Sequence, residues 1–305
     1  MIDVYLWLYH IDLWHEFSKL LYPIKDNIVL HLGLYNGHDN TFIVKNIDKQ
    51  FNHYQIKYHN NIGADILPFI TDFSQNESRN SHFLKIHSKK STLARNTPWR
   101  TILLHSLIGT SDIFYSNHSS MLNHDHGIVC DKNLTLRKQE NTNSFKILEL
   151  LNYYGIPSKQ IVKKQFAAGS MFFGNSGLFE KFFNKDSLKF LTSKLSTEVG
   201  YITDINSGKY AHSLERIFGY ISEYENKTIG NTIYPTKRII NHKSPTHKLH
   251  LVQTHTSFCY IQENITVKGR LLHQEPDSFT IEWHHTDKPT IRKYVKIDNN
   301  TYIGI

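Results

Sequence analysis

The sequence predicts an α/β fold in which a mostly parallel sheet carries helices on both faces. Over the first half of the chain, short β-rich runs alternate with amphipathic stretches, which is the pattern of repeated strand–helix units. The composition supports a large core, because 39% of the 305 residues are hydrophobic and 20% are charged. These fractions exclude a disordered or fibrous protein.

The expected elements follow one another in regular order. We expect strands at residues 4–9, 28–34, 54–58, 82–87, 127–130 and 166–173. We expect helices at residues 13–21, 42–47, 65–73, 99–108, 144–154 and 211–221, with Asp12 as the cap of the first. Ligands bind in the loops beyond the carboxyl ends of parallel strands. The expected binding edge is therefore formed by the loops at residues 9–10, 35–40, 59–65 and 87–91.

The character of the sequence changes after about Lys243. Residues 250–305 are β-rich, contain several turn signals such as Lys288-Pro289 and Asn299-Asn300, and include no convincing helix. We therefore expect two domains, an α/β domain at residues 1–240 and a small β-rich module at residues 241–305.

The net charge of +8 and the isoelectric point near 9.2 predict an anionic partner. Nucleic acids, nucleotide-sugars and anionic lipid head groups all carry phosphates. No RNA-recognition or zinc-finger signature is present, so a nucleic-acid-binding function rests on charge alone. No run approaches the roughly 18 apolar residues of a membrane span, and the first residues lack a basic leader. We expect a soluble, cytoplasmic protein.

Several common chemistries lack their motifs. The chain contains no phosphate-binding P-loop, no G-x-G-x-x-G and no G-x-S-x-G sequence. It also lacks D-x-D, the paired aspartates that would hold a divalent metal on a bound nucleotide. His124 and His126 share one face of an extended segment but have no identifiable third ligand, and the two cysteines form no zinc pattern. We expect neither a metal site nor another cofactor.

A group of basic residues follows the expected strand at 82–87. Strand alternation places Lys85 and His87 on one face, and Lys89, Lys90 and Arg100 come close behind them. Fixed cations of this kind can hold a diphosphate without a metal. The alternative is an ordinary solvated basic loop, but a histidine that ends an apolar strand at the predicted binding edge favours the functional interpretation.

Two further segments contain chemically useful residues. Gly63 and Asp65 lie where a strand leads into a helix, a position that suits an anion, but taken alone this segment favours a plain turn capped by Asp65. Glu215 lies at the edge of the apolar stripe of its helix, while Arg216 points away. A partly buried carboxylate can act as a general base, although a surface ion pair is the alternative.

Four blocks of sequence, in this order and spacing, resemble the rhamnan synthesis protein F family of bacterial polysaccharide glycosyltransferases. The blocks are NIGADILPF at residues 61–69, LKIHSKKS at 84–91 with Trp99-Arg100, FAAGSMF at 166–172 and AHSLERIFG at 211–219. The resemblance covers roughly residues 1–225 and leaves the C-terminal module unassigned. Ala64 departs from it, since we expect a basic residue there in the family.

The resemblance implies a GT-A-like, Rossmann-type enzyme that moves a sugar, with dTDP-rhamnose a typical donor, onto a growing capsule, O-antigen or wall polysaccharide. It implies a lipid-linked or glycan acceptor, an inverting mechanism and peripheral attachment to the inner face of the plasma membrane. The expected donor-binding residues are Asn61, Gly63, Asp65, His87, Lys89, Lys90 and Arg100. Gly169, Ser170 and His212 would lie on the acceptor side, and Glu215 would be the catalytic base.

Two other function classes remain open on the sequence. The chain could be a non-catalytic carbohydrate-binding or assembly subunit of a polysaccharide synthesis machine, in which the C-terminal module binds the glycan. A nucleic-acid-binding protein is the weaker alternative, and salt-dependent binding to random DNA would be needed to support it. Transfer or hydrolysis of a sugar nucleotide by the purified protein separates the enzyme from both.

Overall fold

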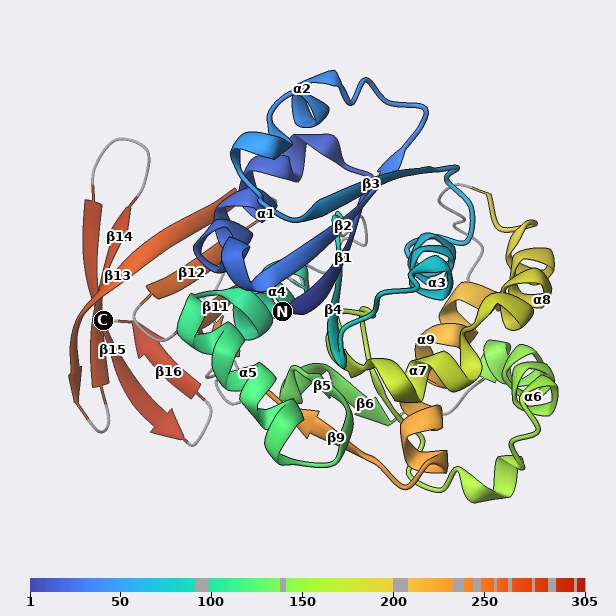
Figure 1. Cartoon of the computed structure of the whole chain (residues 1–305). Coiled ribbons are helices and arrows are strands. Elements are labelled where there is room, and N and C mark those ends of the chain that lie inside the picture. Colours follow the sequence, from blue (N-terminus) through green and yellow to red (C-terminus); the bar gives the residue numbers. More distant parts are fainter. Residues whose placement is uncertain are drawn as a thin grey trace. The chain divides into compact units, whose positions relative to one another are not determined.

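The structure is a computed structural model that describes residues 1–90, 99–137, 141–199 and 208–232 together with strands between residues 239 and 304 (Figure 1). The chain divides into two compact units, and each is described by itself. The first contains Met1–Lys90 and Leu107–Ile233, and the second contains Ser91–Ser106 and Tyr234–Ile305. Among the described helices, none has the length and apolar composition needed to cross a bilayer.

The first unit is built on a seven-stranded sheet with the order β3-β2-β1-β4-β8-β5-β9. Its strands are β1 (Ile2–Leu8), β2 (Ile28–Tyr35), β3 (Tyr54–His59), β4 (His82–His87), β5 (His126–Cys130), β8 (Phe172–Asn175) and β9 (Thr228–Asn231). Neighbouring strands are parallel except at β8, which runs antiparallel to both β4 and β5. The prediction of an α/β fold with a mostly parallel sheet is confirmed, and the architecture is compatible with a Rossmann-like fold.

Helices cover both faces of this sheet. In Figure 1, α3, α7 and α9 lie on one side and α1 and α5 on the other. The helices of the first unit are α1 (Trp14–Leu21), α2 (Thr41–Val44), α3 (Ile66–Gln75), α5 (Ser111–Asn123), α6 (Ser144–Tyr153), α7 (Ser176–Phe182), α8 (Lys185–Leu195) and α9 (Tyr210–Tyr224). Short 3-10 helices lie at Ile11–Leu13, Tyr22–Asn27, Ile47–Lys49, Lys132–Leu134, Asn141–Asn143 and Ser158–Gln160.

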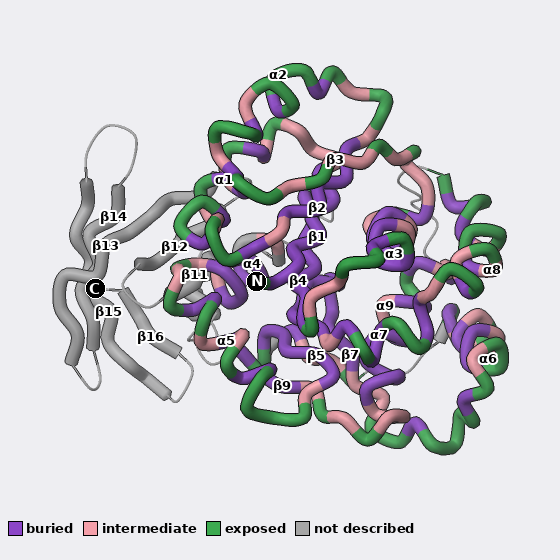
Figure 2. Tube along the Cα trace, viewed as in Figure 1, coloured by how far each residue is buried: buried purple, intermediate pink, exposed green. Residues whose placement is uncertain are grey.

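An aromatic cluster fills the core between the sheet and α3, α7 and α9. The ring centroids of Phe83 and Phe179 are 4.9 Å apart, and those of Phe69 and Phe218 are 5.8 Å apart. Figure 2 shows the central strands buried along almost their whole length. Because side chains alternate along a strand, Lys85 and His87 face the same side of the sheet as Phe83. This alternation directs two titratable groups into the apolar layer.

The structure corrects the prediction of one strand at residues 166–173. The segment forms β7 (Gln165–Ala167), which pairs with β6 (Thr135–Arg137), and then β8. A turn separates them, with positive φ angles of 85° at Gly169 and 51° at Ser170. Apolar residues continue through this turn because it is buried. The pattern of hydrophobicity therefore does not show where the strand is interrupted.

Asp12 does not cap the first helix as predicted. It lies within the 3-10 helix at Ile11–Leu13, and the residue before α1 is Leu13, which makes no side-chain capping bond. The carboxylate of Asp12 instead accepts a hydrogen bond from Lys90 at 2.5 Å. An ion pair with the loop after β4 therefore takes the place of the expected cap.

The second unit contains a sheet whose seven strands follow one another in sequence order, with every neighbouring pair antiparallel. They are β10 (Ile239–Lys243), β11 (Lys248–Thr254), β12 (Ser257–Gln262), β13 (Ile265–Glu275), β14 (Ser278–His284), β15 (Pro289–Asp298) and β16 (Thr301–Gly304). These strands agree with the β-rich composition of residues 250–305. The helix α4 (Trp99–Ile108) has the predicted bounds, and its residues up to Ser106 group with this unit.

Candidate active site at the carboxyl edge of the sheet

The candidate site lies where the loops after β1 and β4 leave the sheet. The strand order runs outward from β1 through β2 and β3, and in the other direction through β4, so these two loops diverge from neighbouring strands. Such a switch point is the usual ligand-binding crevice of an open α/β sheet. The two loops are tied together, because Ser88 donates its N–H to the carbonyl of Trp7 and accepts the N–H of His10, both at 2.9 Å.

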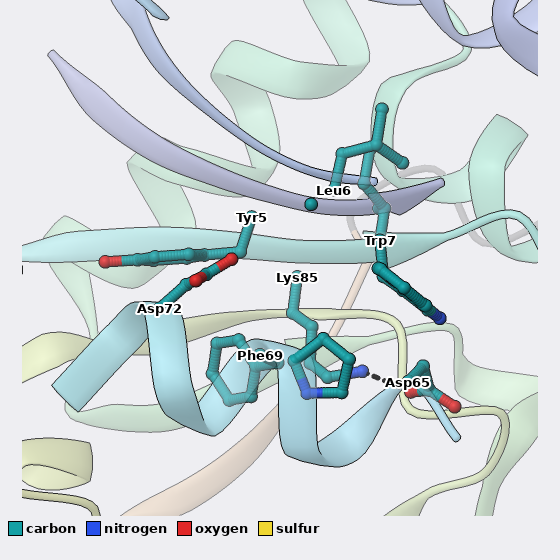
Figure 3. A pocket seen from close by; sticks show the side chains of 10 residues that line it. Tyr5, Leu6, Trp7, Asp65, Phe69, Asp72 and Lys85 are labelled. Atoms are coloured by element: carbon teal, nitrogen blue, oxygen red, sulfur yellow. Dashed lines mark hydrogen bonds and ion pairs between the residues drawn. The ribbon is translucent and has the colours of Figure 1, made fainter. Parts of the chain in front are cut away.

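A buried ion pair between Asp65 and Lys85 forms the base of the site. Lys85 Nζ lies 2.5 Å from Asp65 Oδ2 and also donates to the carbonyl oxygen of Ser170 at 2.9 Å. The Ser170 hydroxyl donates to the same Asp65 oxygen at 2.5 Å. Figure 3 shows Lys85 reaching from its strand toward Asp65, with the ring of Phe69 beside it.

Both Asp65 and Lys85 have several polar partners within the protein, and these keep the two side chains charged. The Lys85 side chain is 1% exposed, so its charge requires the ionised carboxylate and the carbonyl beside it. Burial raises the pKa of Asp65, but interactions with His87 and Lys85 and two hydrogen bonds outweigh burial and hold it well below its usual range. Asp65 therefore stays ionised, and its charge is already matched within the protein.

His87 is a neutral group that fixes the turn at residues 169–170. Its Nε2 donates to the carbonyl oxygen of Gly169 at 2.8 Å and lies 3.7 Å from Asp65 Oδ2. Burial lowers the pKa of His87 to about 4, against a smaller opposing effect of Asp65. A neutral imidazole cannot match the charge of a diphosphate. The geometry thus gives His87 a positioning role in place of the expected role as a fixed cation.

Glu215 approaches the same turn from α9. Its Oε1 accepts the N–H of Gly169 at 2.6 Å, while Oε2 lies 3.8 Å from Arg216 Nη1. Burial raises the pKa of Glu215, opposed by the positive charge of Lys89 and by the hydrogen bond from Gly169. The side chain remains 17% exposed. A carboxylate with one oxygen fixed, partial access to solvent and a raised pKa has the properties of a general base.

Arg216 does not point away from the protein as predicted. Its guanidinium packs on the ring of Phe166 at 4.8 Å from the ring centroid, and its Nη1 donates to the carbonyl oxygen of His212 at 2.6 Å. The helical wheel assigned it to solvent because β7 was not expected to cover that side of α9. Its charge lies close to Glu215 and lowers the pKa of that carboxylate.

The loop before α3 is held by the protein itself. Gly63 has a φ of 65°, and a Cβ there would lie 2.8 Å from the Leu67 Cβ, so this turn requires glycine. The Gly63 N–H donates to the carbonyl oxygen of Glu198 at 2.8 Å. Asp65 precedes α3 but makes no capping bond, because its carboxylate turns to Lys85 and Ser170. Asn61 lies half-buried in the same loop.

The remaining expected residues are distributed unevenly. Lys89 is exposed, and its charge acts on Glu215, His87 and His212, which places it near all three. Lys90 is engaged by Asp12. Arg100 lies on α4, in the stretch that groups with the second unit. His212 and Glu215 are three residues apart on α9 and so share one side of the helix.

A cluster of aromatic rings at the same edge was not predicted as functional. The ring of Tyr9, just after β1, lies 5.3 Å from those of Tyr35 and His38, which are themselves 5.0 Å apart. All three are half-buried. The sequence signal was present, since the first expected strand ends at Tyr9 and the second is followed by Tyr35 at the binding edge.

The closed space beside the ion pair is too small for an organic ligand. The cavity lined by Trp7, Gly33, Asp65, Phe69 and Lys85, among others, has a volume of about 10 Å³ (Figure 3). That volume holds about one water molecule. An organic ligand would therefore lie outside this cavity.

The structure gives no support to the histidine pair as a metal site. Asp125 pairs with Lys227, and His126 Nδ1 lies 2.6 Å from Thr228 Oγ1. Within the described ranges, no group of three or more His, Cys, Asp or Glu side chains could hold a metal ion.

Comparisons of the sequence with protein-family models and with curated proteins gave no match.

Proposed function

We propose that this chain is a glycosyltransferase that moves a sugar from a nucleotide-diphospho-sugar to a hydroxyl of a growing cell-surface polysaccharide. The observation that carries the proposal is Glu215, a carboxylate of raised pKa held by Gly169 at the carboxyl edge of a mostly parallel sheet. The resemblance of four sequence blocks to the rhamnan synthesis protein F family supports it. The Rossmann-like sheet is compatible with the GT-A-like fold that the resemblance implies.

In the proposed reaction, Glu215 Oε2 accepts the proton of the acceptor hydroxyl. The acceptor oxygen attacks the anomeric carbon while the bond from that carbon to the diphosphate oxygen breaks. The electron pair of this bond leaves with the diphosphate, and the anomeric configuration inverts. Glu215 then releases its proton to solvent. Its raised pKa suits this role, because a base works best when its pKa approaches the operating pH.

The donor would lie across the strand ends. The exposed Lys89 is the cation placed to accept the negative charge of the departing diphosphate. The rings of Tyr9, Tyr35 and His38 offer a surface for the base or the sugar of the nucleotide. The Asp65–Lys85–His87 network does not touch the donor in this arrangement. It holds the turn whose Gly169 N–H orients Glu215.

The proposal extends to the setting of the reaction. A dTDP-rhamnose-like donor and a lipid-linked or glycan acceptor follow from the family resemblance. Cytoplasmic sugar nucleotides and a lipid-linked acceptor together place the reaction at the inner face of the plasma membrane. A panel of sugar nucleotides in a thermal-shift experiment would identify the donor, since a specific ligand raises the unfolding temperature by mass action.

The decisive test is the Glu215→Gln variant. The amide oxygen can still accept the Gly169 N–H, so the variant should fold and bind the donor normally. It should lose sugar transfer by about 10² to 10⁴, the usual contribution of a general base. Transfer is measured with the donor found in the thermal-shift panel and a glycan acceptor.

Glu223→Gln is the matched control. Glu223 lies on the same helix, about 12 Å further along its axis, and its carboxylate also accepts backbone N–H groups. This variant should transfer sugar at the wild-type rate. Near-normal turnover by Glu215→Gln would remove Glu215 from the mechanism, and the absence of both donor binding and transfer would contradict the enzyme function as a whole.

A further inference from the structure

An exposed apolar surface with lysines in the same stretch of sequence lies just before β7 in the chain. It consists of α6 and the segment that follows it, and we call it the α6 surface. Phe145 is 77% exposed, Leu148 43% and Val162 79%. Phe145 and Leu148 are three residues apart and therefore share one side of the helix. In Figure 2 the exposed positions of α6 and of the following segment are drawn green.

A cavity opens between these apolar residues. It has a volume of about 430 Å³, and polar and apolar groups contribute about equally to its lining, which includes Lys159 and Lys164. The residues that line it are Leu148, Leu151, Ser158, Lys159, Ile161, Val162, Lys164 and Tyr220. Leu151, Ile161 and Tyr220 are buried and form its floor. The α6 surface thus combines projecting apolar side chains with a hollow beside them.

The projecting segment is held rigidly. The carboxylate of Glu223 on α9 accepts the backbone N–H groups of Val162 and Lys163, each at 2.7 Å, and of Lys164 at 3.1 Å. Lys164 has a φ of 51°, a conformation that a lysine keeps only where its surroundings stabilise it. A large apolar side chain is therefore fixed in water at a cost to stability, which is the feature that requires explanation.

The charge around the α6 surface is positive. Residues 144–164 include four lysines and one acid, Glu149. The carboxylate of Glu149 is engaged by Lys194 at 2.5 Å and by the hydroxyl of Tyr210 at 2.6 Å. The carboxylate of Glu223 is occupied by the three backbone N–H groups. Lys159 and Lys163 are exposed, so the surface presents cations beside apolar groups.

We propose that the α6 surface binds an anionic lipid membrane, with Phe145, Leu148 and Val162 entering the head-group region and Lys159 and Lys163 contacting lipid phosphates. Apolar side chains flanked by lysines are typical of interfacial membrane binding. A nucleic acid would use the lysines but leave the apolar groups in water. A specific protein partner would require about 20 to 30 residues on each side, and this surface is far smaller.

The test uses the full chain and vesicles, without donor or acceptor. The protein should sediment with mixed phosphatidylcholine–phosphatidylglycerol vesicles at low salt, bind them weakly at high salt, and ignore phosphatidylcholine alone. The double variant Lys159→Gln/Lys163→Gln should bind about 25-fold more weakly, at about fivefold for each lysine near an anionic surface. The double variant Phe145→Ser/Val162→Ser should bind at least about tenfold more weakly.

A second exposed patch provides the matched control. Phe42 is 69% exposed, and Lys45 and Lys49 are exposed beside it, but Asp39 and Asp48 are close in sequence. The triple variant Phe42→Ser/Lys45→Gln/Lys49→Gln should bind vesicles like the wild type. All substituted residues are exposed, so each variant should unfold at the wild-type temperature, and circular dichroism checks this.

Three results would overturn the proposal. They are no sedimentation with anionic vesicles at low salt, equal binding by the wild type and both α6-surface variants, or binding to soluble heparin without binding to vesicles. The last result would show that the α6 surface binds soluble polyanions and not lipid membranes. Because the assay needs no sugar nucleotide, its outcome is independent of the proposed glycosyltransferase activity.

Discussion

Ser170 shows how much of the candidate site depends on a single backbone conformation. A φ of 51° costs a residue with a side chain about 1–2 kcal/mol relative to the right-handed region. Three partners stabilise it here, since its carbonyl accepts from Lys85 and its hydroxyl donates to Asp65, while His87 holds the preceding carbonyl. This conformation aims the Gly169 N–H at Glu215. The Glu215 carboxylate is therefore oriented by groups on three other segments.

The stability of this arrangement should fall as the pH falls from 6.5 toward 4.5. The folded-state pKa of His87, about 4, lies below its ordinary value of 6.5, so the unfolded chain binds the proton more tightly. Its contribution is present above pH 6.5 and is lost as the pH falls, at up to about 1.4 kcal/mol per pH unit. Burial lowers the pKa of His118 to about 4 as well, and this adds a slope of the same sign.

The His87→Gln variant isolates the contribution of His87. Its free energy of unfolding, measured with denaturant, should be lower than that of the wild type at pH 7 but should change less between pH 6.5 and 4.5. The exposed His53 provides a control, and His53→Gln should keep the wild-type slope. If His87→Gln and the wild type show the same slope, His87 is not the buried neutral group described above.

The sequence predicted part of the group of residues that meets at this turn, but not what each of them contacts. Asp65, His87, Ser170 and Glu215 come from four separated segments, and the structure brings them together around one turn. Burial decides what each does. The same alternation that put Lys85 and His87 on one face also put them beneath the surface, where they bind protein groups, whereas Lys89 is exposed.

At the scale of elements, segments rich in apolar residues were recognised and a largely polar helix was missed. β4 and α4 have the bounds that the apolar pattern predicts. The helix α5, which was not predicted, has the sequence SDIFYSNHSSMLN, and its polar residues interrupt the apolar stripe. Thr110 provides its start signal by accepting the N–H of Ile113 at 3.3 Å. A cap without an apolar stripe was too weak a signal on its own.

The contact between α9 and β7 leads to a prediction about glycine. A Cβ on Gly219 would lie 2.1 Å from the carbonyl oxygen of Gln165, so the helix and the strand approach too closely for any side chain. Gly219→Ala should lower the free energy of unfolding by about 1–3 kcal/mol, although alanine favours helices. Because α9 carries Glu215, the same change should also slow sugar transfer. Denaturant unfolding measures the first effect.

Gly177 on α7 provides the matched control for this prediction. Its added Cβ would approach no atom closer than 3.5 Å, so Gly177→Ala should stabilise the protein by roughly 0.5 kcal/mol through helix propensity alone. Equal effects of the two substitutions would show that the close approach of α9 to β7 is not needed for stability.

At the scale of the whole molecule, the sequence predicted the layers but not their connections. Alternating strands and helices implied a parallel sheet, yet β8 enters between β4 and β5 in the opposite direction. The direction of β8 depends on the path that the chain takes after β7. The local hydrophobic pattern does not determine that path. Similarly, Ser91–Ser106 groups with the C-terminal strands across more than a hundred residues of sequence. The proposed functions, likewise, depend on surfaces assembled from distant segments.

The last prediction concerns how the molecule neutralises the departing diphosphate. A fixed cation about 4 Å from a phosphate charge contributes about 4 kcal/mol at the effective dielectric of a protein surface. In the proposed reaction Lys89 supplies this charge, and the sequence lacks the D-x-D pair that would hold a metal there. Transfer should therefore persist in EDTA at the rate measured without it. Lys89→Gln should lose much of its transfer rate, and added manganese should not restore it. Complete loss of wild-type transfer in EDTA, restored by magnesium or manganese, would show instead that a metal ion carries this charge and that Lys89 has a lesser part.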